Sequence, residues 1–308
     1  MRENMYYIKK GIRMILSIFF IGTCSFCLLE WIPGDPATAI LGVEASAKDI
    51  ENLRQQLGLD LSFGERYWNW IYGAFHGNLG TSFKYGESVS KLILERLPLT
   101  LSIAIFSIVL VFLVSIPFAF ALHNIKNKKI RNFWESILGI FISIPSFWLG
   151  ILFMYFFGII LRWTSTGYND SYRSLVLPCC IIAIPKIGWI TMHLYANLYK
   201  ELREEYIKYF YSNGMKKRYL NLYILKNAIL PIVPLTGMML LELVTGVVII
   251  EQIFSIPGIG RLLVSSVFTR DIPLVQGLIF YTSTFLVLMN FGIDILYSLI
   301  DPRIRLGE

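Results

Sequence analysis

Three ionisable residues lie inside long apolar runs of this 308-residue chain, namely Lys186, Glu242 and Asp294. A charge at the centre of a membrane span costs about 2.5–3.5 kcal/mol, so we expect each of them to face water or another charge. Met238 and Met239 precede Glu242 closely enough to share a broad helical face with it. A carboxylate beside thioethers suits a cation or a metal ion. A protonated or hydrogen-bonded glutamate that serves helix packing explains the same residues equally well.

No catalytic arrangement accompanies these residues. A phosphate-binding loop needs the pattern Gly-x-x-x-x-Gly-Lys-Ser/Thr, and the nearest segment, residues 77–82, lacks the lysine. The metalloprotease pattern His-Glu-x-x-His does not occur, and the histidines are scattered at His76, His123 and His193. Cys24 and Cys27 have the spacing of a zinc or redox half-site without a second pair, which favours a packing role. We therefore predict no catalytic residue, no certain metal site and no cofactor bound by this chain.

The composition is that of an integral membrane protein. The chain is 55% hydrophobic and 16% charged, with a mean hydropathy of +0.59, which is more apolar surface than a soluble domain can bury. Apolar runs long enough to cross a bilayer lie at about 14–32, 98–122, 133–161, 174–196, 229–250 and 274–300. We expect an all-α fold with six transmembrane helices. Pro98 fits the first turn of the second helix, whereas Pro145 and Pro185 should kink the helices that contain them.

Lysine and arginine mark the segments that we expect to face the cytoplasm. They gather before the first run, between the second and third, between the fourth and fifth, and after the sixth. This pattern predicts cytoplasmic N- and C-termini. It also accounts for the net charge of +7 without a nucleic-acid partner. A cleaved signal peptide is the alternative for the first run because residues 37–39 are small, but the run is long for a signal peptide and a Pro-Gly-Asp-Pro turn intervenes.

Two polar segments separate the apolar runs. Residues 33–97 should lie outside the cell as short amphipathic helices, with Ser46 as a helix cap. The aromatic residues of this segment suit the bilayer interface: Tyr67, Trp68, Trp70 and Tyr72. Residues 204–231 should lie in the cytoplasm as a helix, a turn at Asn213-Gly214 and a second basic helix. Three consecutive aromatic residues, 209–211, would be costly in water, which favours a docking surface over a solvated connector.

Several segments together resemble one protein family. They are IPGDPA at 32–37, residues 53–83, ERLPLT at 95–100, residues 249–277 and LIDPRIR at 299–305. They look like the permeases of dipeptide, oligopeptide and nickel ABC importers, in order and at matching distances. Residues 204–231 resemble the cytoplasmic coupling loop of the family, although Lys208-Tyr209-Phe210 stand where many members carry Glu-Ala-Ala.

The resemblance implies a type I ABC importer permease fold in a bacterial plasma membrane. The partners would be a second, related permease, two ATP-binding subunits that hold ATP and magnesium, and an extracellular solute-binding protein. The implied ATPase-coupling helix runs from Tyr209 to Lys217 and includes Phe210, Gly214, Met215 and Lys216. Lys186, Met238, Met239, Glu242 and Asp294 would line the path, although Asp294 fits a structural seam with Asn290 and Tyr297 better.

The resemblance leaves the cargo open between nickel and di- or oligopeptides. It divides the chain into a tail with the first helix (1–32), an outer segment (33–97) and a five-helix core (98–308) with a cytoplasmic loop at 200–228. A secondary transporter driven by an ion gradient is the alternative from another class. That alternative predicts inverted repeats and discontinuous helices, and no repeat is visible in the sequence.

Overall fold

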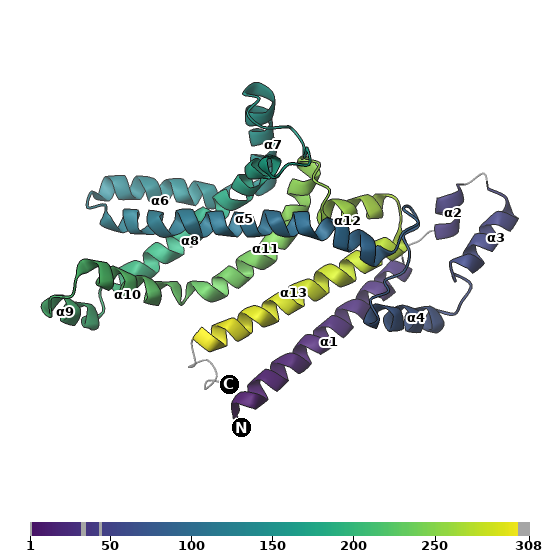
Figure 1. Ribbon diagram of the computed structural model, residues 1–308, viewed down its shortest axis with the longest axis horizontal. Helices are drawn as coiled ribbons and strands as arrows, with labels where there is room; N and C mark the ends of the chain where they lie inside the picture. The colour runs from purple at the N-terminus through teal and green to yellow at the C-terminus, as the bar shows by residue number, and fades with distance from the viewer. Residues whose placement is uncertain (1, 32–34, 43–44, 301–308) are drawn as a thin grey trace. The chain divides into compact units, whose positions relative to one another are not determined.

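The computed structural model describes residues 2–31, 35–42 and 45–300, and helices dominate this part of the chain (Figure 1). An isolated bridge between Thr81 and Ser88 is the only β pairing among the described residues. The all-α prediction is therefore confirmed. The long helices are α1 (Arg2–Glu30), α5 (Val89–Asn124), α6 (Lys128–Ser143), α8 (Val176–Glu201), α11 (Ile232–Ile253) and α13 (Ile272–Ile300). The shorter ones are α2 (Pro36–Leu41), α3 (Ala47–Gln56), α4 (Phe63–Phe75), α7 (Ser146–Phe153), α9 (Glu205–Ser212), α10 (Lys217–Ile229) and α12 (Ile259–Phe268).

The candidate membrane spans overlap each of the predicted apolar runs. Within the described residues, four helices are long and apolar enough to cross a membrane, and two bent helix pairs raise the number to six. One pair is α6 with α7 and its π-helical continuation Met154–Ile160, bent by 94°. The other is α10 with α11, bent by 54°. Each bend lies at a proline, Pro145 or Pro231, whose ring and missing N–H interrupt the helix, as predicted for Pro145.

One expectation about the second span is wrong. Pro98 does not lie in the first turn of its helix, because α5 already begins at Val89. The polar residues at its start keep the helical conformation, and Lys91 bridges Glu87 and Glu95 through i,i+4 ion pairs that favour it.

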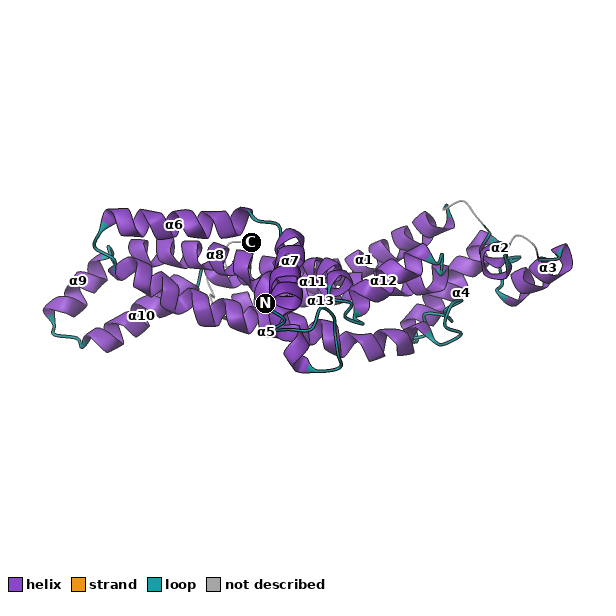
Figure 2. Ribbon diagram, turned by 90° about the horizontal axis from the view of Figure 1, so that it is seen from above, coloured by secondary structure: helices purple, strands orange, loops and turns teal. Residues whose placement is uncertain are grey.

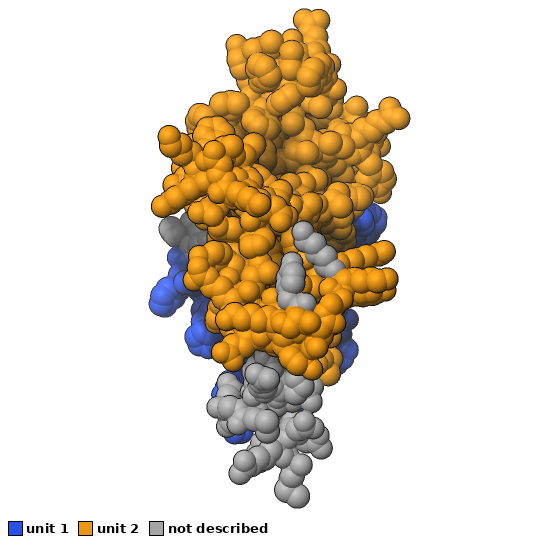
Figure 3. Space-filling model, turned by 90° about the vertical axis from the view of Figure 1, so that its left-hand side faces the viewer, with its two compact units in different colours: residues 1–98, 257–291 blue, residues 99–256, 292–308 orange. Residues whose placement is uncertain are grey.

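The chain divides into two compact units, coloured separately in Figure 3. Unit 1 comprises residues 1–98 and 257–291, and unit 2 comprises residues 99–256 and 292–308. The boundary between the units at 98/99 lies one residue from the boundary at 97/98 that the resemblance implies. Residues 257–291 group with the N-terminal part of the chain in unit 1.

Unit 1 has a core of aliphatic residues from α5, α12 and α13. Gly277 of α13 allows α13 to approach the start of α5, since a Cβ atom there would lie 2.4 Å from Val89. Helices α3 and α4 begin at serine caps, and the predicted Ser46 cap accepts a hydrogen bond from the Asp49 amide. Of the aromatic residues assigned to the bilayer interface, Tyr67 and Trp70 instead pack on Phe26, whereas Trp68 and Tyr72 are exposed.

Unit 2 is built around α8, which contributes more buried residues to its hydrophobic core than any other helix does. Buried hydroxyl groups of α5 bond across to α8, where Ser107 and Ser115 donate to the carbonyl groups of Cys179 and Ile187. Such contacts satisfy polar groups where a membrane supplies no water. Figures 1 and 2 agree that the α5–α6 connection and the α9–α10 turn lie at one end of unit 2, and that α7 lies at the other end. The two loops of unit 2 that are predicted to be basic and cytoplasmic, between α5 and α6 and at the α9–α10 turn, therefore share one end.

Candidate functional site

The end of unit 2 formed by α9, the following turn and α10 is a helix-turn-helix (residues 205–229). We call it the cytoplasmic tip, after the side of the membrane that the sequence predicts for it. Gly214 occupies the turn with φ = +72°, a conformation that side chains other than glycine rarely adopt. The predicted turn is therefore confirmed. The residues from Tyr209 to Lys217 do not form one helix, in contrast to what the resemblance implies. They comprise the last turn of α9, the turn itself and the first residue of α10.

The aromatic residues of the tip are less exposed than the sequence suggests. Phe210 is partly buried, with its ring 5.4 Å from that of Tyr223 and 5.9 Å from that of Tyr206. Tyr209 is 67% exposed, Met215 is 38% exposed, and the polar residues around them are exposed as well: Lys208, Asn213, Gly214 and Lys216. The side chains of Tyr211 and Lys217 lie outside the described residues. Of the described aromatic side chains beside the turn, Tyr209 is therefore exposed among basic residues, whereas Phe210 is packed against the tip itself.

A hydrogen-bond network attaches the cytoplasmic tip to the membrane-spanning part of unit 2. The Tyr206 hydroxyl donates to the Glu201 carboxylate at the end of α8. Asn227 of α10 donates to the same carboxylate at 2.8 Å and to the Tyr206 oxygen at 3.0 Å. Burial and the Glu201 carboxylate raise the pKa of Tyr206 to about 12, so the hydroxyl keeps the proton that it donates. Three helices thus meet at one carboxylate. This network could not be predicted from the sequence, because its members come from separate helices.

Inside the spans, the structure brings two of the predicted ionisable residues together. Lys186 of α8 donates from Nζ to the Glu242 carboxylate of α11. Met239 is only 1% exposed and packs in the core of unit 2, whereas Met238 is 57% exposed. The expectation that both methionines share a face with Glu242 is therefore wrong for Met239. The arrangement predicted for a cation, a carboxylate between two thioethers, is replaced by an ion pair beside one exposed thioether.

Two further acidic residues of unit 2, Asp294 and Glu251, are partly or fully buried. Asp294 lies on α13 and is partly buried, and its neighbour Ile293 packs directly on Gly237 of α11. Glu251, near the end of α11, is fully buried and accepts a hydrogen bond of 2.6 Å from the Thr100 hydroxyl. Glu251 was missed by the sequence reasoning because it lies at the predicted edge of a span. Among the described residues, no group of three or more His, Cys, Asp or Glu side chains could hold a metal ion.

In unit 1, a buried aspartate joins the loop before α5 to the start of α13. Asp271 is 1% exposed and accepts hydrogen bonds from the Ser82 hydroxyl at 2.5 Å and from the amides of Phe83 and Lys84 at 3.1 Å. It also accepts from the Leu274 amide in the first turn of α13. The sequence held a signal for this role, since an aspartate directly before Ile-Pro is typical of a helix N-cap.

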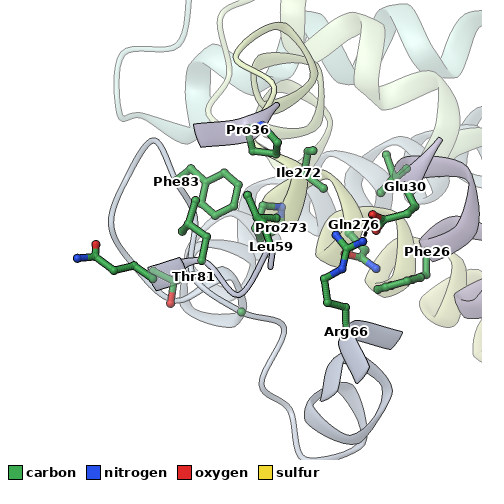
Figure 4. A pocket seen from close by; sticks show the side chains of 14 residues that line it. Phe26, Glu30, Pro36, Leu59, Arg66, Thr81, Phe83, Ile272, Pro273 and Gln276 are labelled. Atoms are coloured by element: carbon green, nitrogen blue, oxygen red, sulfur yellow. Dashed lines mark ion pairs between the residues drawn. The ribbon is translucent and has the colours of Figure 1, made fainter. Parts of the chain in front are cut away.

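A cavity of about 390 Å³ lies next to this junction in unit 1 (Figure 4). An ion pair of 2.5 Å between Arg66 of α4 and Glu30 of α1 lies in its wall, so the charged groups there compensate each other. The remaining wall is largely apolar and includes Phe26, Phe83 and Pro273. By the predicted topology this cavity faces the outside of the cell.

Comparison with known proteins finds two family models that match this chain. Residues 115–306 match the family model described as binding-protein-dependent transport system inner membrane component, and residues 4–104 match the model for the N-terminal region of such membrane components. The chain is 34% identical over 312 residues to a putative peptide transport system permease protein of Brucella abortus, covering 97% of this chain and 98% of that protein.

Two further relatives have names that point to different cargoes. The oligopeptide transport system permease protein AppB of Bacillus subtilis is 32% identical, with 97% of this chain and 99% of AppB covered. The nickel import system permease protein NikB of Staphylococcus aureus is also 32% identical, with 99% of this chain and 92% of NikB covered. Both matches extend over nearly the whole chain.

Proposed function

Because this chain belongs to the binding-protein-dependent transport system inner membrane components, the permeases of peptide and nickel ABC importers, we propose that it is the membrane-spanning subunit of an ATP-driven importer in a bacterial plasma membrane. It supplies half of the path for a peptide or nickel cargo. A second, related permease supplies the other half. Two ATP-binding subunits, which hold ATP and Mg²⁺, bind at the cytoplasmic face, and a solute-binding protein delivers cargo from outside.

We assign the coupling of ATP hydrolysis to transport to the cytoplasmic tip. The observation that carries this assignment is the exposed Tyr209 ring at the end of unit 2, with exposed basic residues around it. An aromatic ring with neighbouring cations is typical of the energetic centre of a protein interface. The Glu201–Tyr206–Asn227 network supports the assignment, because it connects both helices of the tip to the end of α8.

An ion-gradient-driven secondary transporter remains the alternative from another class. The bends at Pro145 and Pro231 are of the kind that such transporters use at their binding sites. The two functions differ in their energy source. Uptake into vesicles that contain ATP, with every ion gradient collapsed by ionophores, should continue for the importer and stop for the secondary transporter.

Purification of the chain in a mild detergent from its native host tests the assembly. We expect one second permease and two ATP-binding subunits to co-purify, and we expect ATP hydrolysis to rise when the solute-binding protein and cargo are added. Isolation of the chain alone, with uptake that depends on an ion gradient, would contradict the proposal.

A further inference from the structure

The ion pair between Lys186 and Glu242 has a position that needs an explanation. Both residues lie within predicted membrane spans, and the pair joins α8 to α11 within unit 2. Yet the side chain of Glu242 is 62% exposed, while that of Lys186 is 21% exposed. Glu242 lies in an exposed stripe of α11 with Met238 one turn before it and Ile249 two turns after it. The pair therefore lies at the surface of unit 2 and not in its core.

This surface is poorly suited to contact with lipid. Charged groups in a hydrocarbon environment are costly, and they are found facing water, protein or one another. The side chain of Glu242 is 62% exposed, and hydrocarbon could not solvate a carboxylate at that surface. The stripe around Glu242 must therefore border either a water-filled path or another protein subunit.

We propose that Lys186 and Glu242 together form a site for a dipolar cargo, with Glu242 taking the ammonium terminus of a short peptide and Lys186 its carboxylate terminus. This inference rests on the proposed function and specifies its cargo. When a peptide arrives, one internal ion pair is exchanged for two pairs with the cargo. No charge is left unpaired during this exchange, which keeps the cost of opening the internal pair low. The exposed Met238 beside Glu242 offers a flexible apolar contact for varied peptide side chains.

A bare divalent cation fits this site poorly. A metal ion at Glu242 would displace the Lys186 ammonium and would then lie beside a like charge. Met239, the second thioether that a soft cation could use, lies in the core of unit 2. The charges at the site therefore select a zwitterion over Ni²⁺.

The test uses the complete importer reconstituted with its solute-binding protein in vesicles. We would compare uptake of a tripeptide with uptake of the same tripeptide N-acetylated and C-amidated, and we would measure radioactive Ni²⁺ separately. The variants are the doubly neutral K186Q/E242Q and the reversed pair K186E/E242K. Lys200→Gln, in the last turn of α8 outside the apolar run, is the matched control. The solute-binding protein is the same throughout. Its own selectivity therefore cancels when the ratio of free to blocked tripeptide uptake in each variant is divided by the same ratio in wild type.

We expect wild type to prefer the free tripeptide and to leave Ni²⁺ untransported. In the doubly neutral variant the preference for the free tripeptide should be about three- to tenfold smaller, because two partly exposed ion pairs with the cargo are lost. The reversed pair should keep the preference within about twofold, because it offers the same two charges. The Lys200→Gln control should match wild type.

Three results would overturn the inference. They are an unchanged preference in the doubly neutral variant, a reduced yield of the complex in place of altered selectivity, and wild-type uptake of Ni²⁺ without uptake of the peptide. The second result would assign the pair to an interface with the second permease. Failure of wild type to take up either cargo with ATP would instead refute the proposed function, so the two failures can be told apart.

Discussion

Replacing Gly214 with valine tests whether the turn of the cytoplasmic tip transmits energy. Gly214 has φ = +72°, and a Cβ atom added there would meet no other atom within 4 Å. The cost of the substitution is therefore almost entirely backbone strain, about 1–2 kcal/mol for a non-glycine residue in this region and at the upper end for a β-branched one. About 2 kcal/mol lowers the population of the native turn roughly thirtyfold relative to alternative turns.

The expected result is a loss of coupling with membrane insertion retained. The strained turn is at the end of unit 2, outside the predicted spans, so the variant should insert as wild type does. Cargo uptake in reconstituted vesicles should fall about tenfold or more, together with the stimulation of ATP hydrolysis by the loaded solute-binding protein. These two quantities, divided by the yield of complex, form the assay.

Two control variants separate strain from other effects of the substitution. Gly214→Asn should retain most of the coupling, because asparagine adopts positive φ far more readily than valine does. Gly64→Val places the same side chain at a helical glycine of α4 with equally open surroundings and should leave coupling unchanged. Full uptake and full stimulation in Gly214→Val would refute the role given to this turn. Equal losses in the valine and asparagine variants would show that backbone strain is not the cause.

Three further predictions concern the topology and unit 1. In a background without the native cysteines, an impermeant thiol reagent should label Asp60→Cys in intact cells and Lys128→Cys only after permeabilisation; labelling of position 128 from outside would contradict the six-span topology. Asp271→Asn should destabilise unit 1 by about 2–3 kcal/mol, because the asparagine amide presents a donor to groups that are themselves hydrogen-bond donors. A thermal unfolding midpoint equal to that of the control Asp60→Asn would argue against this role of Asp271. Gly277→Ala should lower the free energy of unfolding by about 1–3 kcal/mol through overpacking against α5. Gly292→Ala in the same helix, where an added Cβ atom would meet no atom within 4 Å, should be neutral or slightly stabilising in the same melting assay.

The helical class, the spans and the turn were readable from the sequence because each depends on local composition. A bilayer requires about twenty apolar residues per helix, so apolar runs by themselves identify candidate spans. Pro145 interrupts its helix whatever packs around it, because the proline ring and the missing N–H act locally. Gly214 was identifiable for the same reason, since the need for positive φ is a property of the backbone at one position. The short segments typical of the permease family were likewise visible as letters, and the comparisons confirm the family.

The contacts among side chains could be decided only by the tertiary structure. The sequence reasoning placed Met238, Met239 and Glu242 on one face, but which part of α11 turns inward is set by its packing on α8, and that packing buries Met239. Lys186 and Glu242 are separated by 56 residues, so their pairing depends on how two helices cross.

The hydrogen bonds around Asp271 and Glu201 were likewise beyond what the sequence alone could predict. Asp271 and Ser82 lie 189 residues apart, and the members of the Glu201–Tyr206–Asn227 network belong to three helices. Periodicity along one helix shows which residues share a face, but it contains no information on the element that the face meets. Composition therefore determined that this chain has several helices long and apolar enough to cross a membrane. Helix packing decided which charges meet there, because only packing brings residues that are distant in the chain within hydrogen-bonding distance.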